Sequence, residues 1–419
     1  MRSKLLVVAI AAGLGFTSLA SVAAPAPQSS KSSTASNAEI EMLKAQVAAM
    51  QAKLDELEQR TDAQSDINVS TGQAIEKVQA SSANDTKIAA LEKAINNTTL
   101  SGKMYFDFTN IDQKNSDTGS TNATGTGIDV KRFYLTVDHK FDDVWSANLT
   151  TDFNYVSNDG ETNLFVKKAY VEGKFDPAFK LRIGSADMPW IPFVENYYGF
   201  RYVENTLTDR LKYANSADWG LHAAGDFGAS KSVNYAVSVV NGNGYKNPSR
   251  SKGVDFEGRI GFVPFENMIV AVGGYSGHRG QETQSVNAQN TATRGDVMVA
   301  YADKSVRVGV EYFTAKDWNT ILSPVSDKSD GYSVWGSVGV ADGVTLFARY
   351  DSAKLSKDLD SDAKDTYYNA GVEFDITKGF KLAAVYKHEK GEKSVATPIP
   401  PHVQNVKTDE IGVFGEVKF

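Results

Sequence analysis

From Leu100 onward the chain alternates apolar residues with polar or small ones at a period of two. That period places alternate side chains on opposite faces of a β-strand. The last segment, 407–419, shows it plainly, with one face made by Ile411, Val413, Gly415, Val417 and Phe419. A strand that faces lipid must pair on both edges, because lipid offers no partner for a bare N–H or C=O group. We therefore expect the strand that ends at Phe419 to close a barrel against the first strand.

Sixteen segments share this alternation and are expected to be strands. They are 99–109, 128–140, 144–156, 163–175, 179–187, 217–228, 231–241, 253–264, 267–277, 295–303, 305–315, 331–341, 343–353, 366–376, 379–389 and 408–419. Short turn-like links alternate with longer polar links such as 110–127 and 278–294. An up-and-down barrel has this parity, whereas a soluble β-sandwich has no reason to keep it. The sequence predicts an all-β fold over residues 98–419, a 16-stranded antiparallel transmembrane β-barrel.

Composition limits the other classes of protein. The 419 residues are 41% hydrophobic with a negative mean hydropathy, and after residue 25 no apolar run reaches the length of a membrane-spanning helix. Cysteine is absent, which excludes disulfides, thiol catalysis and cysteine-based zinc sites. The net charge of −7 argues against a nucleic-acid partner.

The N-terminal region reads as three segments. Residues 1–23 are typical of an export signal, with Arg2 and Lys4 before an apolar run and a small-residue cleavage site at 21–23. A retained membrane helix is the alternative, but the apolar run is short for one. Residues 24–37 are rich in Pro and Ser and are expected to form a flexible linker.

Residues 38–97 are expected to form a coiled-coil segment. Apolar residues recur at alternating steps of three and four: Ile40, Leu43, Val47, Met50, Leu54 and Leu57. The register then passes through polar positions, regains Ile75 and Val78, and is expected to break before Ile88. The narrow seam favours self-association over packing on a core, although it leaves the number of chains open.

The link between the fifth and sixth strands, residues 188–216, is long and unusually aromatic. Among its residues are Trp190, Phe193, Tyr197 and Tyr198. A long, apolar loop in a barrel is usually functional, and we expect this one to fold inward and narrow the lumen. The alternative is an external loop that packs on itself or at a subunit contact.

Basic residues of this loop and of the wall are candidates for an anion path at the constriction. They are Arg182, Arg201, Arg210, Lys212, Arg132, Lys168, Arg259, Arg307 and Arg349. Cations along a pore attract anions by focusing the field in a low-dielectric wall. Acidic residues share the same faces, so ordinary solvated ion pairs in a wide channel remain the alternative.

The run Phe165 to Phe175, FVKKAYVEGKF, followed by Leu181-Arg182-Ile183-Gly184, resembles strands of the phosphate-selective porin O and P family. The export signal, the heptad segment, the sixteen strands and the terminal Phe419 agree with that resemblance. It implies a trimeric, water-filled outer-membrane channel whose inner basic residues draw anions through. We therefore expect a porin for small hydrophilic solutes, with a preference for anions or phosphate.

The resemblance also implies partners and a location. We expect outer-membrane lipid, the outer-membrane assembly machinery and two further copies of the chain as partners, with the coil in the periplasm. The alternative function is a structural tether that grips a periplasmic or cell-wall partner through the coil. No catalysis, metal or cofactor is expected, because the five histidines are scattered; His222 is the one candidate for a Ser–His pair on the wall.

Overall fold

The computed structural model describes residues 33–79, 88, 91–93, 95–119, 124–154, 162–228, 231–393 and 405–419. The chain divides into two units, Met1–Ile88 and Ala89–Phe419, each of which is described by itself. The expected export signal, 1–23, and the linker up to residue 32 lie outside the described residues.

The described residues of the first unit lie mainly in one helix, α1, over Ser33–Gln79. It begins within the range expected for the linker and runs through Gly72 without a break. The seam side chains Leu43, Met50, Leu54 and Leu57 each expose 58–60% of their surface. Their self-association stays a prediction. Among the described residues, no helix is both long enough and apolar enough to cross a membrane.

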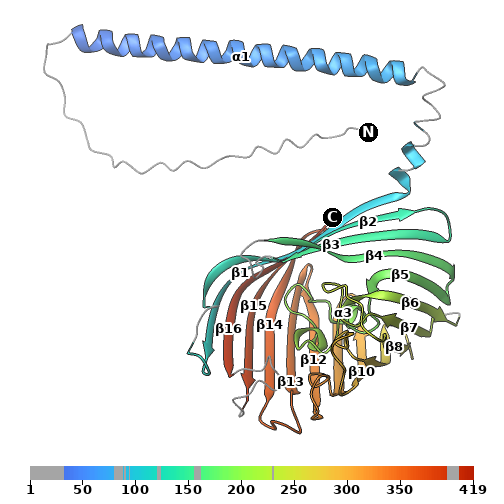
Figure 1. Cartoon of the computed structure of the whole chain (residues 1–419). Coiled ribbons are helices and arrows are strands. Elements are labelled where there is room, and N and C mark those ends of the chain that lie inside the picture. Colours follow the sequence, from blue (N-terminus) through green and yellow to red (C-terminus); the bar gives the residue numbers. More distant parts are fainter. Residues whose placement is uncertain are drawn as a thin grey trace. The chain divides into compact units, whose positions relative to one another are not determined.

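The second unit is a closed antiparallel barrel, and its described residues form sixteen strands, as the sequence predicts (Figure 1). The strands are β1 (Thr98–Asn115), β2 (Gly125–Lys140), β3 (Trp145–Asn154), β4 (Asn163–Asp176), β5 (Phe179–Asp187), β6 (Ala217–Phe227), β7 (Val233–Val240), β8 (Asp255–Phe262), β9 (Met268–Gly277), β10 (Ala292–Ala302), β11 (Val306–Lys316), β12 (Lys328–Ala341), β13 (Val344–Lys354), β14 (Lys364–Thr377), β15 (Phe380–Glu392) and β16 (Val406–Lys418). Each strand pairs with its neighbours in sequence, and β16 returns to β1.

The expected closure at Phe419 is present. β1 and β16 pair from Lys103↔Lys418 to Asn115↔Val406, and the Phe419 and Gly102 backbones exchange two hydrogen bonds of 2.9 and 3.1 Å. The Phe419 ring covers Gly102, where an added Cβ would meet the ring at 2.2 Å. Closure leaves no sheet edge for lipid to contact. The rim where β1 begins and β16 ends is called the turn side here, and the opposite rim is called the loop side.

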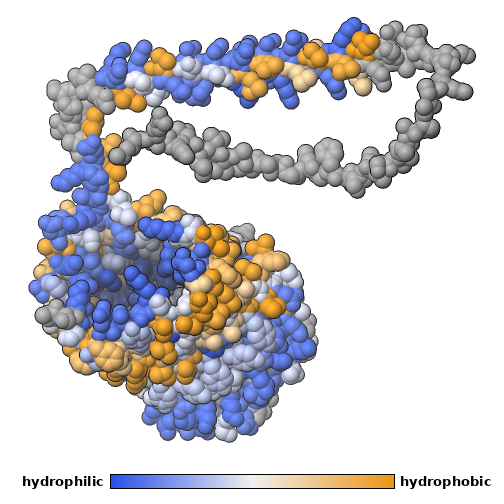
Figure 2. All heavy atoms as spheres, turned by 180° about the vertical axis from the view of Figure 1, so that it is seen from behind, coloured by the Kyte–Doolittle hydropathy of each residue, from blue (hydrophilic) through white to orange (hydrophobic). Residues whose placement is uncertain are grey.

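The alternation of side chains separates an outer apolar face from an inner polar one. On β11, for example, Val308, Val310 and Tyr312 are 41–50% exposed. Glu311 and Phe313, which have the opposite phase, are fully buried. Figure 2 shows the result from behind, with orange apolar side chains on part of the outer surface and a blue hollow at the barrel mouth. This is the pattern expected of a wall with lipid outside and water inside.

Residues 188–216, between β5 and β6, contain two short helices, α3 (Ile191–Tyr198) and α4 (Leu207–Arg210). They contact the buried face of the wall, α3 at β10 and β11 and α4 at β12. The outer side chains of these strands stay exposed, so the segment lies inside the closed barrel (Figure 1). We call residues 188–216 the inner loop.

Candidate functional site

The inner loop begins with a buried tryptophan that fastens it to the wall. The Trp190 backbone N–H donates to Glu257 on β8 at 3.0 Å, and its indole Nε1 donates to Glu311 on β11 at 2.7 Å. The ring packs over Gly273 on β9, where any Cβ would meet it at 2.7 Å. A buried indole N–H requires a partner, and this one finds a carboxylate. The residue joins three strands to the loop.

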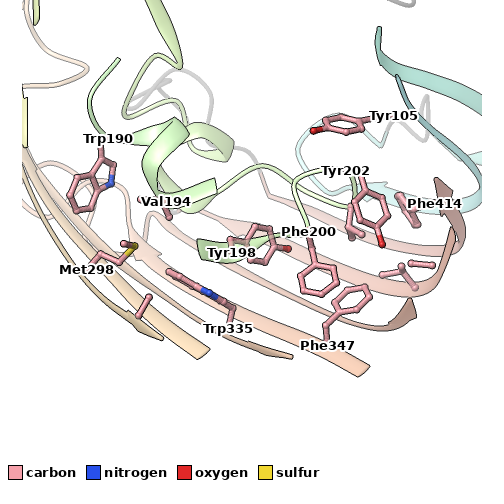
Figure 3. Packing of buried hydrophobic residues seen from close by; sticks show 14 of the residues in the cluster. Tyr105, Trp190, Val194, Tyr198, Phe200, Tyr202, Met298, Trp335, Phe347 and Phe414 are labelled. Atoms are coloured by element: carbon pink, nitrogen blue, oxygen red, sulfur yellow. The ribbon is translucent and has the colours of Figure 1, made fainter. Parts of the chain in front are cut away.

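From Trp190 the loop follows the wall strand by strand (Figure 3). The Tyr198 ring meets Trp335 on β12 edge-on, and the Phe200 ring stacks on Phe347 of β13 with centroids 4.2 Å apart. The Tyr202 hydroxyl then donates to Glu373 on β14 at 2.8 Å. Trp190 and Tyr198 therefore both contact the wall. Phe193 lies against the guanidinium of Arg259, 3.6 Å from its ring, and Tyr197 contacts Phe193.

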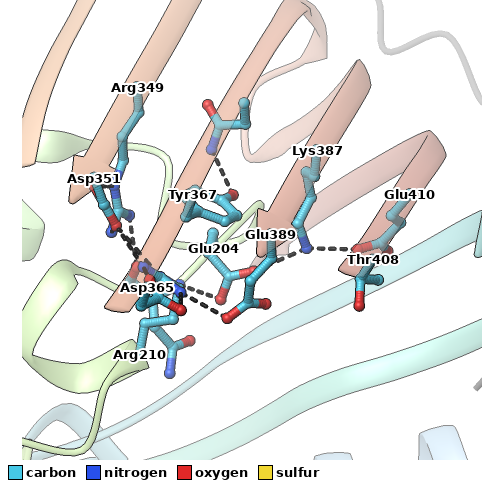
Figure 4. Close-up of polar contacts among 12 residues, drawn as sticks. Glu204, Arg210, Arg349, Asp351, Asp365, Tyr367, Lys387, Glu389, Thr408 and Glu410 are labelled. Carbon is cyan, nitrogen blue, oxygen red and sulfur yellow. Dashed lines mark hydrogen bonds and ion pairs between the residues drawn. The ribbon is translucent and has the colours of Figure 1, made fainter. Parts of the chain in front are cut away.

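Charged groups fasten the far half of the loop (Figure 4). Arg210 bonds Asp365 at 2.5 Å and Glu389 at 2.7 Å, and its side chain is only 6% exposed. Glu204 pairs with Lys387 on β15 at 2.8 Å. Burial alone would raise the pKa of the Glu204 carboxyl, but the ammonium groups of Lys387 and Lys131 hold that pKa well below its usual value. Three ionic contacts therefore tie the loop to β14 and β15.

Several candidate cations of the wall serve this same anchoring. Arg259 donates to the Pro189 carbonyl at 3.0 Å, and Arg307 donates to the Asn196 carbonyl at 2.9 Å. Arg349 donates to the Asn205 carbonyl at 2.5 Å while pairing with Asp351. These three arginines, with Arg210, have their donors directed at the loop backbone or at wall carboxylates. The structure thus places four of the nine sequence candidates at the contact between the loop and the wall.

The wall from β1 to β5 differs, because cavities separate it from the inner loop. One cavity includes Lys103, Lys167 and Lys168 in its lining, a second includes Lys131 and Arg132, and a third, toward the loop side, includes Lys212 and Lys246. Arg201 of the inner loop lines all three. The cavities therefore converge on one arginine. We call them together the open side of the lumen.

Two β-bulges set the charge of the open side. Opposite β1, the pairing steps from Tyr105↔Arg132 to Phe106↔Val130, which leaves Lys131 as an extra residue on β2. Opposite β3, it steps from Thr150↔Lys168 to Thr151↔Val166, which leaves Lys167 as an extra residue on β4. A bulge lets two consecutive residues share a face. Lys131-Arg132 and Lys167-Lys168 thus both line the lumen.

Strict period two places Lys131 and Lys167 on the outer face, so the sequence analysis missed them. A signal existed in the sequence. Each lysine would have shared a lipid-facing side with residues such as Leu135 and Val171, where a charge is costly. That conflict could have been resolved by one extra residue in each strand.

The cations of the open side are paired to different degrees. Arg201 bonds Glu195 at 2.6 Å, and Lys168 bonds Asp187 at 3.0 Å. Arg132 lies 3.4 Å from Asp152. Lys103 and Lys167 have no ion pair with a described residue; the Lys167 ammonium lies 4.6 Å from the Tyr134 ring centroid and 3.3 Å from its hydroxyl. A lysine held by an aromatic ring keeps an uncompensated charge.

The remaining candidates do not line the three cavities that meet at Arg201. Arg182 pairs with Glu172 at 2.6 Å and lines a separate cavity near the start of the inner loop. His222 lines the same cavity and bonds the Ser238 hydroxyl at 2.8 Å, as a Ser–His pair would require. Its other ring nitrogen meets the Asp218 backbone carbonyl, whereas a hydrolase orients its histidine with a carboxylate. Among the described residues, no cluster of His, Asp and Glu suits a metal ion.

Comparison with known proteins places the fold among porins. The chain resembles the anion-selective porin from Comamonas acidovorans at a TM-score of 0.53 and 12% identity, covering 77% of this chain and 99% of that one. Salmonella typhi OmpF, in a complex with daunomycin, gives 0.51 at 13% identity over 77% and 97%. A loop-deletion mutant of the outer-membrane protein OmpT from Vibrio cholerae gives 0.50 at 16% identity over 77% and 99%. At these identities the likeness concerns the fold.

A family model adds evidence from the sequence itself. No curated protein sequence matches the chain. Residues 99–191, which span β1 to β5 and the start of the inner loop, match the model of the family described as phosphate-selective porin O and P. This segment includes Lys131, Arg132, Lys167 and Lys168 of the open side. The chain folds as a closed β-barrel like those of porins, and the resemblance to the phosphate-selective porin O and P family is confirmed over residues 99–191.

Proposed function

We propose that this protein is an outer-membrane porin, a water-filled diffusion channel for small hydrophilic solutes with a preference for anions. The observation that carries the proposal is the asymmetry of the lumen. The inner loop fills the side against β8 to β15, and solutes pass along the open side. There Lys103 and Lys167 present positive charge without a carboxylate partner among the described residues.

The charge on the open side supports anion preference by a simple argument. The cavity at Lys167 is lined by four cations, Lys103, Lys167, Lys168 and Arg201, and by two carboxylates, Asp187 and Glu195. A narrow passage with a low-dielectric wall strengthens the field of each unpaired ammonium. An anion at Arg201 would meet Lys167 and Lys103 in the same cavity. The similar barrel from Comamonas acidovorans is an anion-selective porin, which agrees with this preference.

The assembly belongs to the same proposal. We expect a homotrimer in the outer membrane with α1 on its periplasmic side, because the exposed seam of α1 has the spacing of a coiled coil. A cysteine placed at Leu43 or Leu54 and joined by a trifunctional thiol cross-linker would give covalent trimers if the seams meet. If the protein is instead a structural tether, the folded protein should form no channel or only a closed one.

The test of the channel is the reversal potential of the full-length protein in planar bilayers under a potassium chloride gradient. We expect a potential of the sign set by chloride permeation, and a fall in chloride current when phosphate is added. A reversal potential of the cation sign would refute the anion preference and leave a general porin. Folded protein that gives no conductance steps would refute the channel itself.

A further inference from the structure

The outer face of the barrel carries a row of lysines at the loop side. Three consecutive hairpins, β11–β12, β13–β14 and β15–β16, each place one lysine directly opposite another in the ladder. The pairs are Lys316↔Lys328, Lys354↔Lys364 and Lys390↔Lys407. All six side chains are exposed and share the outward phase of their strands. We call these six residues the lysine row. Lys114, opposite Lys407 on β1, extends it.

A second row fixes the depth of the first in the membrane. Four residues nearer the turn side, the same hairpins pair Tyr312↔Tyr332, Tyr350↔Tyr368 and Tyr386↔Ile411. The five tyrosines point outward and are 38–43% exposed. Outward aromatic girdles mark the boundary between the hydrocarbon and the headgroups. The lysine row therefore lies at the level of the lipid headgroups.

Opposed lysines cost free energy in a sheet, because directly opposite residues have Cα atoms only about 4.5–5.5 Å apart and their like charges repel each other. Neighbouring carboxylates relieve only part of this: Lys390 lies 2.6 Å from Glu392 and Lys407 lies 3.2 Å from Asp409, all at least 30% exposed. Lys354 and Lys364 make no ion pair with a described residue. An anion held between the strands would offset the repulsion at every pair.

The row is confined to one part of the barrel. The outward positions in the loop-side halves of the described β2 to β10 are apolar or uncharged, for example Ile128, Leu164, Phe256 and Thr293. General solubility would not restrict lysines to seven adjacent strands at one height. With strands about 4.8 Å apart, the six-strand row spans roughly 24 Å, wide enough for more than one lipid.

We propose that the lysine row binds the phosphate groups of lipid headgroups in the leaflet at the loop side of the barrel. Each opposed pair supplies two ammonium groups to one phosphate, and the tyrosines below contact the boundary of its acyl chains. This surface lies outside the lumen and does not depend on the selectivity of the channel. Its test can therefore fail while the proposed function stands, and the reverse.

The experiment measures thermal unfolding of the full-length barrel in nanodiscs of phosphatidylcholine, with and without lipid A. The test variant is Lys354→Gln/Lys364→Gln, whose two charges face each other. The matched control is Lys304→Gln/Lys378→Gln, with the same change of charge in turns at the opposite rim. Inorganic phosphate, added to discs without lipid A, serves as the probe for a free anion.

We expect lipid A to raise the unfolding temperature of the wild type and of the control equally. Without lipid A the test variant should be as stable as the wild type or more so, because the repulsion is gone. Its gain from lipid A should be largely lost, with apparent affinity weakened by roughly tenfold or more for two lysines. Native mass spectrometry of the same samples would count the retained lipids.

Four results would overturn the proposal. The wild type gains nothing from lipid A, or the test variant gains as much as the wild type. If the turn-side control loses the gain from lipid A to the same extent, the effect depends only on the overall charge of the protein. Stabilisation by inorganic phosphate equal to that by lipid A would assign the row to a free anion instead of a lipid.

Discussion

The two sides of the lumen use the same kinds of residue for opposite purposes. Against β8 to β15, arginines and carboxylates are buried. The arginine N–H groups donate to the inner loop, as Arg349 does to the Asn205 carbonyl. Against β1 to β5, the cations line cavities, and Lys103 and Lys167 have no ion pair with a described residue. A basic residue inside a barrel is therefore not a pore residue by its phase alone. What matters is whether the wall at that point is covered.

Removal of the Trp190 anchor should give the largest effect. Trp190→Ala would empty a fully buried site and remove the indole donor of Glu311, while the backbone N–H that bonds Glu257 would remain. We expect a loss of about 3–5 kcal/mol in the free energy of unfolding, as for other buried tryptophans. Denaturant unfolding of refolded barrel in detergent measures this. Single-channel conductance should rise as the loop loosens; an unchanged conductance would contradict the anchoring role.

Deletion of Lys167 should sharpen the comparison at smaller cost. Because Lys167 is the extra residue of a bulge, its removal joins Thr150↔Lys168 and Thr151↔Val166 into one regular register. We expect the barrel to fold and its anion preference to fall as in Lys167→Gln. Deletion of Val171, in a regular part of β4, is the control and should shift every residue on one side of it to the wrong face. Equal folding yields of the two deletions would argue against the bulge.

Acid should weaken the far half of the loop by a smaller amount. Glu204 has a pKa held well below its usual 4.5, so its pairing with Lys387 stabilises the fold above that pH. The contribution is lost as the pH falls through the range below 4.5 toward the folded pKa. Limited proteolysis of the loop at decreasing pH should show increasing cleavage. Glu204→Gln should remove this part of the pH dependence, and an identical profile in that variant would contradict the assignment.

The barrel could be predicted from the sequence because its physics is local and repetitive. Period two, the parity of short and long links, and an apolar outer face follow from lipid on one side and water on the other. The inner loop was also expected to fold inward, since Trp190, Tyr198 and their neighbours require burial. These features recur along the strands, so no single residue decides them.

The division of labour among the cations could not be predicted in the same way. Arg307 and Arg349 are basic and lie on the lumen-facing side of their strands, as pore residues do. Only the path of the inner loop shows which carbonyls they bind. Lys131 and Lys167 depend on bulges, whose position is a property of pairing between strands. Trp190 reaches Glu311 over 121 residues of sequence. Contacts of that range are absent from local patterns.

The most direct test of the account is the reversal potential of Lys103→Gln/Lys167→Gln beside that of Arg307→Gln, in planar bilayers under one potassium chloride gradient. The first variant removes two cations of the open side that have no ion pair with a described residue, and the second removes a cation from the covered side. We predict that the first moves the potential strongly toward the cation sign and that the second leaves it near the wild-type value. An equal shift in both, or a larger one in Arg307→Gln, would contradict the claim that solutes pass along the open side.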